Sequence, residues 1–567
     1  MKRISIILLL AVILLAPLSA RTVSQEIIPL SSSVYSDMDL LYLITGNGTP
    51  SNARPWTKTE AFHILHRVDP LQLERAGEAL YHTLLDGLSD SPTIQEKDGF
   101  LLDIGFTYNL EGYYHSNGED FTKDTDWIYG FEDRKPMFKF DIGFGIDPFF
   151  YSFTDLQYSR NRFTDRDIFN PEDDDAPPVD VIGSIIEEGN TATIVEHSHI
   201  YSQRFMSNVL IPTYDVDFQT PKRAVISFGG AQWNMNLSRD RVKWGNGHSG
   251  NFIIDDHVDY HEFARVSGFT NRFKYDLLYV FFETNPSTSE GSSADEEFRM
   301  LMAHRLEFRI LDNLTFAVSE NIMYRNDVLN LRYLNPANVY HNLNSRRLFN
   351  AIAHVELDYS PIPKVNIYGQ YVLDQAVAPN ESASQADATG FLVGVEYATP
   401  LKKGILSTSL EFAQTSPAMY RREYVDFLMF RRYHGNGTSF VSHIDYIGYQ
   451  YGGDTQLIQW DVGLRLLPAM QFNFRVIGMR QGKVDYSMSN DDVNEIRDPT
   501  PYGDTVTERG IITLGGELSY PNLFSALDAA LWFQVDLVGQ RVYDRTTETY
   551  GGHIGDVQVS LGVGLSL

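Results

Sequence analysis

The sequence predicts an all-β transmembrane barrel of about 18 antiparallel strands with a small N-terminal helical bundle, and three observations lead to that prediction. From Leu101 onward, apolar and polar side chains alternate with a period of two. After the first twenty residues no run of about eighteen apolar residues occurs, which excludes a helical membrane protein. The 567 residues include 32 Tyr, 35 Phe and 42 Gly, a composition that suits a wall whose lipid face takes only every second residue.

The first twenty residues predict a secretory signal peptide, which takes no part in the fold. Lys2 and Arg3 supply the positive start, residues 4–16 an apolar core, and residues 17–20 a cleavage site. The apolar core is shorter than a membrane-spanning helix needs, and a membrane anchor is the alternative interpretation. The sequence has no Cys, which excludes lipoprotein-type anchoring, disulfides and thiolate metal sites.

Residues 21–98 predict a helical element. Capping boxes that begin at Ser36 and Thr57 each precede an apolar run, and the pair Asp69-Pro70 predicts the start of a third helix. Gly46 and Gly87 predict two of the helix ends. Helices this short need a surface to dock on. We therefore expect the element in the periplasm, either as a plug of the barrel or as a domain that binds a periplasmic partner.

Residues 99–567 predict one barrel domain without a linker. In the final strand, the odd positions from Val557 to Leu567 are apolar, and Gln, Ser and Gly separate them. Such an ending makes the outer-membrane barrel-insertion machinery an expected partner, together with outer-membrane lipid. About 25 residues per strand and connection give roughly 16 to 20 strands, and a barrel of that width leaves a water-filled or plugged lumen. The alternative is a large, secreted, soluble β-rich protein.

Long polar insertions predict extracellular loops. They are Asn161–Asn190, Asn285–Glu297, Ala376–Ala388 and Ser487–Thr507. The formal net charge of −28 suits acidic surface loops and argues against nucleic acid as a partner. The acidic run Glu172–Asp175 is favoured as part of a solvated loop over a loose calcium site.

The stretch from Phe228 to Ser267 is the main candidate for ligand binding. It places Arg241, Trp244, Asn246 and His248 beside a turn-rich segment. Guanidinium groups bind carboxylates in a bidentate manner, and an indole supplies a flat apolar face. This combination predicts a site for a polar, anionic or sugar-like ligand. The alternative is that these side chains pack the lumen and hold the helical element.

A second polar-aromatic stretch adds Asn335, Asn338 and Tyr340 as weaker candidates for contacts with sugar hydroxyls. Its alternative is a strand-to-turn junction in which Asn335-Pro336 makes the bend. The basic pairs Arg421-Arg422 and Arg431-Arg432 either join the same surface or contact lipopolysaccharide-like anions.

Metal binding and catalysis find little support in the sequence. His257 and His261 would lie about 13 Å apart on a strand, too far to share one ion. No Gly-x-Ser-x-Gly motif is present, and the scattered Ser and His residues impose no catalytic geometry. We expect no metal, no cofactor and no enzymatic activity.

The central stretch resembles the Wzi family of capsule-assembly outer-membrane proteins. That family carries an Arg/Trp-rich run in mid-chain, with one more Trp than this sequence has. The matching residues are Arg241, Trp244-Gly245-Asn246-Gly247, Ser249-Gly250 and Ile253-Ile254. The resemblance implies about 18 strands, a helical bundle at the periplasmic end and a location in the outer membrane of a diderm bacterium. It also implies a lectin-like role, in which the protein binds capsular or other surface polysaccharide, with polysaccharide export proteins as further partners.

Two other functions remain open at this point. A porin or substrate-specific channel would need an open lumen, and an outer-membrane lipid hydrolase would need a serine and a histidine brought together on the barrel wall.

Overall fold

A computed structural model describes most of the chain. The described residues are 24–89, 94–95, 99–162, 201–210, 216–217, 220–282, 298–326, 330–335, 337–340, 349–375, 386–421, 425–434, 440–467, 469–486, 488, 490–524 and 527–567. The predicted signal peptide, the acidic run Glu172–Asp175, the whole of Asn285–Glu297, and most of Asn161–Asn190 and Ala376–Ala388 lie outside them.

The described chain forms a closed antiparallel barrel of eighteen strands, as the sequence predicts. The barrel closes where the last strand pairs with the first, with Val559 opposite Tyr114. The wall consists of β3 (Phe100–His115), β4 (Phe138–Ile146), β5 (Phe150–Arg160), β8 (Ala224–Gly229), β9 (Trp233–Asp240), β11 (His261–Phe269), β12 (Phe273–Phe282), β13 (Phe298–Leu311), β14 (Leu314–Asn326), β15 (Phe349–Ile362), β16 (Val365–Gln375), β17 (Ala388–Leu401), β18 (Gly404–Thr415), β21 (Thr455–Leu466), β22 (Met470–Gln481), β23 (Thr505–Phe524), β24 (Leu527–Asp544) and β26 (Ile554–Ser566).

Short strands extend this wall or lie inside it. The strands β2 (Ile94–Gln95), β6 (Phe205–Ser207), β7 (Val216–Asp217) and β25 (Thr549–Tyr550) pair with wall strands. Two separate pairs are formed by β1 (Ala53–Arg54) with β10 (Lys243–Trp244), and by β19 (Leu428–His434) with β20 (Phe440–Tyr446).

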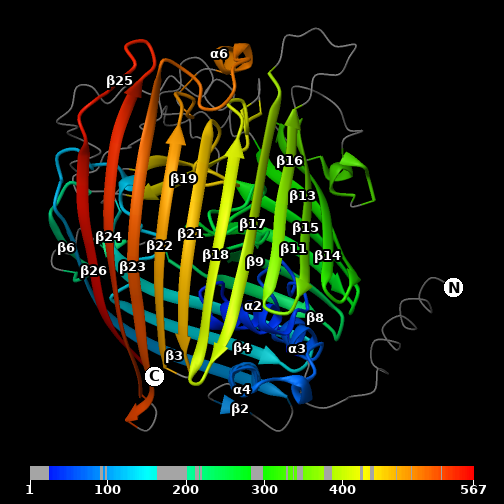
Figure 1. Ribbon diagram of the computed structural model, residues 1–567. Coiled ribbons are helices and arrows are strands. Elements are labelled where there is room, and N and C mark those ends of the chain that lie inside the picture. The colour runs from blue at the N-terminus through cyan, green and yellow to red at the C-terminus, as the bar shows by residue number, and fades with distance from the viewer. Residues whose placement is uncertain are drawn as a thin grey trace.

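The two ends of the barrel differ in their connections. At one end, which we call the turn end, neighbouring strands are joined by short turns such as residues 312–313, 363–364 and 402–403. At the other end, the loop end, the connections are long, for example residues 241–260 and 416–454. Figure 1 shows the helices α2, α3 and α4 and the C-terminus at the turn end, and α6 (Asn490–Glu495) at the loop end.

The wall has an apolar outer face and a polar inner face. In β15, for example, the side chains of Val355 and Leu357 are 40% and 47% exposed, whereas His354 and Glu356, which alternate with them, are buried. A water-soluble protein shows the opposite arrangement, with apolar side chains buried and charges exposed. Exposed apolar and buried polar side chains are what a wall between hydrocarbon and an aqueous lumen requires.

The N-terminal element contains α2 (Ser33–Thr45), α3 (Lys58–Leu65), the short 3₁₀ helix η1 (Pro70–Gln72) and α4 (Arg75–Ser89). Thr57 caps α3 as predicted, because its side chain accepts a hydrogen bond from the backbone N–H of Glu60. The predicted capping box at Ser36 is wrong, since Ser32 caps α2 one turn earlier. Asp69-Pro70 starts only the 3₁₀ turn, so α4 begins five residues later than Pro70 and runs past Gly87.

The helical element packs against the inner face of the wall. Its apolar side chains share a buried cluster with Ala398 and Ile405 of the wall. Ion pairs add to this contact: Asp37 of α2 lies 3.1 Å from Arg465, and Glu60 of α3 is paired with Lys274. No helix in the described part of the chain is both long enough and apolar enough to cross a membrane. The helical element and the loops that pack inside the lumen together set the shape of the remaining cavities.

Candidate functional site

The connection between β9 and β11, residues 241–260, folds back into the lumen instead of extending past the loop end. Its strand β10 pairs with β1 of the N-terminal element, with Trp244 opposite Ala53. Gly245 has a φ of 122° and lies against the Asn251 and Gln370 side chains, so a Cβ atom there would collide with both. The glycines that the sequence presents as a flexible ligand loop therefore allow close packing inside the barrel.

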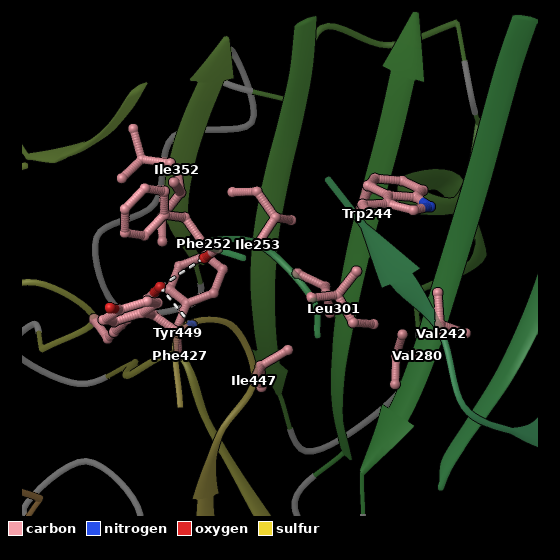
Figure 2. Packing of buried hydrophobic residues seen from close by; sticks show 14 of the residues in the cluster. Val242, Trp244, Phe252, Ile253, Val280, Leu301, Ile352, Phe427, Ile447 and Tyr449 are labelled. Atoms are coloured by element: carbon pink, nitrogen blue, oxygen red, sulfur yellow. Dashed lines mark hydrogen bonds between the residues drawn. The ribbon is translucent and has the colours of Figure 1, made fainter. Parts of the chain in front are cut away.

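Trp244 lies at the centre of a buried apolar cluster. Its partners include Phe252, Ile253 and Ile254 of the same loop, and Leu278 and Leu301 of the wall. Figure 2 shows Val242 and Trp244 against the wall near Val280 and Leu301, with Phe252 and Tyr449 further along the cluster. The indole is fully buried, so it is not available as a stacking surface for a ligand in this conformation.

Asn246 and His248 line a cavity of about 570 Å³ between α2 and the wall strands β17, β18, β21 and β22. Asn246 donates a hydrogen bond to the Asp358 carboxylate, and His248 Nε2 lies 2.6 Å from Glu396 Oε1. Burial opposes the charged imidazolium, but the hydrogen bond to Glu396 and the nearby carboxylates outweigh it and raise the pKa of His248 to about 9. Both side chains hold the loop to the wall.

The cations of this cavity are matched by carboxylates. The pairs are Arg54 with Asp39, Lys243 with Asp256, His248 with Glu396, Arg465 with Asp37 and Arg475 with Asp461. A cavity whose charges are already paired offers an anionic ligand little additional attraction.

Arg241 lines a second cavity, of about 690 Å³, which also reaches β3, β4, β5, β24 and β26. Its guanidinium donates to the backbone oxygens of Glu132 and Asp259. These contacts fix the side chain, yet among the described residues no carboxylate lies within ion-pair distance of it. Arg241 therefore lies beside a cavity of ligand size without a direct ion pair, although the Asp133 carboxyl is close enough to feel its charge.

Two residues that the sequence analysis did not select, Arg134 and Lys135, line the same cavity. The Arg134 guanidinium lies 4.3 Å from the ring centroid of Tyr113 and 4.7 Å from that of Phe131, and its Nε and Nη2 atoms have no hydrogen-bond partner among the described residues. Lys135 Nζ lies 3.5 Å from the ring centroid of Trp532. Burial lowers the pKa of Lys135, although Glu517 and Glu111 oppose this shift.

We call Arg134, Lys135 and Arg241 the lumen cation cluster. The cavity around it also contains matched pairs, among them Arg223 with Asp240 and Lys222 with Asp217. The cluster differs from them because none of its three members forms an ion pair with a carboxylate in the described chain. A sequence signal existed: aromatic residues at positions 127, 129 and 131 precede the charge-dense run 132–135.

Asn335, Asn338 and Tyr340 lie on the other side of the wall. Residues 330–335 and 337–340 fold down over the outer face of β12–β15, where Tyr340 covers Met300, Met302 and Ile322. Met300 and Met302 lie an even number of residues before Phe308 and Ile310 on β13, so all four side chains point to the same face of the wall. Phe308 and Ile310 are exposed there, which identifies it as the outer face. The wall therefore separates these three predicted residues from Arg241, Trp244, Asn246 and His248, and the seven cannot form one site.

The contacts of this outer cluster are internal. The Tyr340 ring stacks on His304 with centroids 4.8 Å apart, and its backbone N–H donates to Glu320 Oε2 at 3.0 Å. Asn335 Oδ1 accepts a hydrogen bond from the backbone N–H of Ala337. Asn335 thus makes the bend, as the structural alternative for this stretch expects.

The remaining sequence candidates also have partners inside the protein. Arg421 donates to the backbone oxygens of Asp485 and Met488, and Arg431 donates to that of Tyr260. Both arginines are buried, whereas Arg422 and the Arg432 side chain lie outside the description. His261 Nδ1 accepts the backbone N–H of Val242, and in the described chain no group of three or more His, Asp or Glu side chains is arranged to hold a metal.

Comparison with known proteins identifies the fold. No protein-family model and no curated protein sequence matches this chain. Among solved structures, Wzi from Escherichia coli, described as a carbohydrate-binding β-barrel of the outer membrane involved in group 1 capsule assembly, is similar over 96% of this chain and 99% of its own, with a TM-score of 0.54 and 13% identity. The barrels OccAB4 of Acinetobacter baumannii and OccK2 of Pseudomonas aeruginosa each cover 82% of this chain, and 98% and 97% of their own, with TM-scores of 0.39 and 0.36 and identities of 8% and 9%. The chain therefore has a Wzi-like fold, as the sequence resemblance implies.

Proposed function

We propose that this protein is a non-enzymatic, lectin-like barrel of the outer membrane that binds surface polysaccharide and retains it at the cell. In this proposal the turn end faces the periplasm, the long connections face the cell exterior, and the helical element plugs the barrel. The Wzi-like fold over nearly the full chain supports the proposal. So does the packing of the helices and of residues 241–260 inside the lumen, which favours a plugged barrel over an open channel.

The observation that carries the proposal is the lumen cation cluster. Arg134, Lys135 and Arg241 place three cations without an ion-pair partner in the described chain on one cavity of about 690 Å³. The Arg134 guanidinium lies over the Tyr113 and Phe131 rings, with its Nε and Nη2 atoms buried and without a hydrogen-bond partner among the described residues, and Asn208 and Gln157 belong to the same lining. Guanidinium and ammonium donors suit the carboxylate of an acidic sugar, and amides suit its hydroxyl groups. The preferred ligand is therefore a polysaccharide that contains uronate or another acidic substituent.

Binding to purified glycans tests this preference. We expect the full-length mature protein in detergent to bind acidic polysaccharides more tightly than neutral ones. The substitution Arg134→Gln should weaken that binding about tenfold, because one charge-assisted hydrogen bond is worth roughly 1.5–3 kcal/mol. Asn335→Ala on the outer face is the matched control and should leave the affinity unchanged. Equal affinity of the wild-type protein for acidic and neutral glycans, or unchanged binding of acidic glycans by Arg134→Gln, would contradict the proposed site.

Two further measurements separate this function from the alternatives. Cells that lack the protein should still make polysaccharide but release it into the medium. In planar bilayers the plugged barrel should conduct no ions, whereas a porin should conduct them in its resting state. Turnover of phospholipid by the purified protein would instead indicate a lipid hydrolase.

A further inference from the structure

A row of charged side chains crosses the outer face of the barrel near the loop end. Arg480 of β22, Glu508 of β23 and Arg541 of β24 are opposite one another in the strand register. Arg541 donates to Glu508 Oε2 from Nε at 3.0 Å and from Nη2 at 2.8 Å, and Arg480 Nε lies 3.4 Å from Glu508 Oε1. We call these three residues the outer arginine row.

The strand parity places this row outside the barrel. On β22, the neighbours Ile477 and Met479 point inward and are buried, so Gly478 and Arg480 point outward. On β24, Leu531 and Leu537 are exposed on the outer face and share the parity of Arg541. The Arg480 and Arg541 side chains are themselves 47% and 46% exposed.

Along the strands, the row lies at one edge of an apolar layer on the outer face of the barrel. Ten residues toward the turn end, the same three strands align Met470, Leu518 and Leu531. The outward side chains between the two rows are apolar or glycine: Phe472, Phe474, Val476, Gly478, Gly510, Ile512, Leu514, Gly516, Phe533, Val535, Leu537 and Gly539. Ten residues of a strand tilted by about 40° rise roughly 25 Å, which is the height of the apolar band of an outer-membrane barrel. The row therefore lies where hydrocarbon gives way to lipid headgroups.

Aromatic and imidazole groups border the row. The Arg541 guanidinium lies 3.9 Å from the ring centroid of Tyr550, and Tyr550 packs against Tyr543 with centroids 4.9 Å apart. The exposed His553 ring lies beside Gly539 and Gly555. It is so close that a Cβ atom on Gly539 would come within 3.0 Å of His553 Nε2. Tyr residues are typical of the headgroup level of a membrane.

The charges of the row do not balance. Two guanidinium groups share one carboxylate, and Arg480 contacts it through Nε alone, which leaves its two terminal nitrogens free for another acceptor. Elsewhere on the outer face, Arg239 is matched one-to-one by Glu262. A surplus cation at the headgroup level favours an anionic lipid, and guanidinium geometry suits a phosphate, which it binds through two parallel hydrogen bonds.

We propose that the outer arginine row binds the phosphate of an acylated, phosphorylated glycolipid of the outer leaflet, such as the lipid A part of lipopolysaccharide. The choice of the outer leaflet rests on the proposed orientation, in which the loop end faces the cell exterior. The acyl chains would lie on the apolar band below the row, and the sugar and phosphate groups would meet Arg480, Arg541, His553 and Tyr550. Such a lipid would be held at the rim of the barrel, apart from the lumen.

Lipid binding to the full mature protein in detergent tests this site, with native mass spectrometry as the readout. Diphosphorylated lipid A should bind, and enzymatically dephosphorylated lipid A should bind at least tenfold more weakly. The double substitution R480Q/R541Q should reduce binding of the phosphorylated lipid about tenfold, and R480K/R541K should restore part of it. R239Q is the matched control, since it also removes an outward arginine, and it should retain wild-type binding. Heat-modifiable migration in detergent gels verifies that each variant is folded.

Several outcomes would overturn the proposal. Equal binding of the phosphorylated and dephosphorylated lipids, or full binding by R480Q/R541Q, would exclude a phosphate site at the row. Competition by inorganic phosphate at the same concentration as lipid A would indicate an anion site without lipid recognition. Preference for phosphatidylglycerol over lipid A would assign the row to an ordinary phospholipid. Retention of polysaccharide by cells that carry R480Q/R541Q should be normal, so failure of this site leaves the proposed function intact.

Discussion

Two connections of this barrel fold back onto the wall from the loop end, one inside and one outside. Residues 241–260 enter the lumen, and residues 330–335 and 337–340 cover the outer face of β12–β15. Both contain Asn together with aromatic residues, and the sequence offers both as ligand-binding stretches. What separates them is the face of the wall that each one meets.

Inside, the polar side chains are anchored by charged partners on the wall: Asn246 donates to Asp358, and His248 pairs with Glu396. Outside, the loop contributes mostly apolar and aromatic cover, and Tyr340 lies over the His304–Glu320 pair of the wall and donates its backbone N–H to Glu320. The comparison teaches that polar side chains anchor the loop that faces the lumen, whereas aromatic and apolar side chains form the cover on the face toward lipid. Breaking a comparable contact on each face should therefore lower the free energy of unfolding by different amounts.

The largest difference is expected for ion pairs. On the inner side, Lys274 donates to the Glu60 carboxylate and to the Ala53 backbone oxygen, and both charged groups are buried. Lys274→Met should reduce the free energy of unfolding by about 3–5 kcal/mol, because it leaves a buried carboxylate without its partner. Arg239→Gln on the outer face breaks a partly exposed pair with Glu262 and should cost at most about 1 kcal/mol. Denaturant titration in detergent measures both values.

A functional readout accompanies this prediction. Glu60 belongs to α3, so loss of its anchor should loosen the helical element and let Lys274→Met conduct ions in planar bilayers. Arg239→Gln should stay closed. Equal stability losses in the two variants would contradict the distinction between the faces.

The sequence predicts the wall better than it predicts the site, for a physical reason. The period of two follows directly from the two solvents, and it places residues such as Phe140 and Leu561 on the outer face, where both are exposed. The chain length limits the strand number to roughly 16 to 20, the family resemblance implies about 18, and the apolar spacing in the N-terminal element locates its helices. These features depend on local pattern alone.

The site depends on where each connection folds, which no local pattern encodes. Trp244 and Tyr340 look alike as ligand-binding aromatics, yet both are buried, one on each face of the wall. The charge-dense run after the aromatic residues 127, 129 and 131 marks Arg134 and Lys135 in the sequence, but only the structure shows that neither forms an ion pair with a carboxylate in the described chain. Whether Arg241, Trp244, Asn246, His248, Asn335, Asn338 and Tyr340 bind a ligand stays a prediction.

A second, intermediate effect on the free energy of unfolding is expected from the loop that covers the outer face of β12–β15. Tyr340 is buried among Met300, Met302 and Tyr324, so Tyr340→Ala should cost about 2–4 kcal/mol, toward the low end because the loop can collapse onto the cavity. The cost should appear as faster cleavage by chymotrypsin within residues 327–348, with the conductance unchanged. An open lumen in this variant would show that the two faces are coupled through the wall.

The smallest effect tests the anchor of the inner loop through its pH dependence. The pKa of His248 is raised from its ordinary value of 6.5 to about 9 in the folded protein, so the stabilisation by its charged form is fully present below pH 6.5 and is lost as the pH rises through 9. His248→Gln replaces a charge-assisted hydrogen bond to Glu396 with a neutral one and should cost about 1 kcal/mol at pH 6. Above pH 10 the variant and the wild type should be equally stable in denaturant titrations. A difference that persists unchanged from pH 6 to pH 10 would mean that the imidazole acts by its shape and packing, and that the inner loop does not depend on this charge.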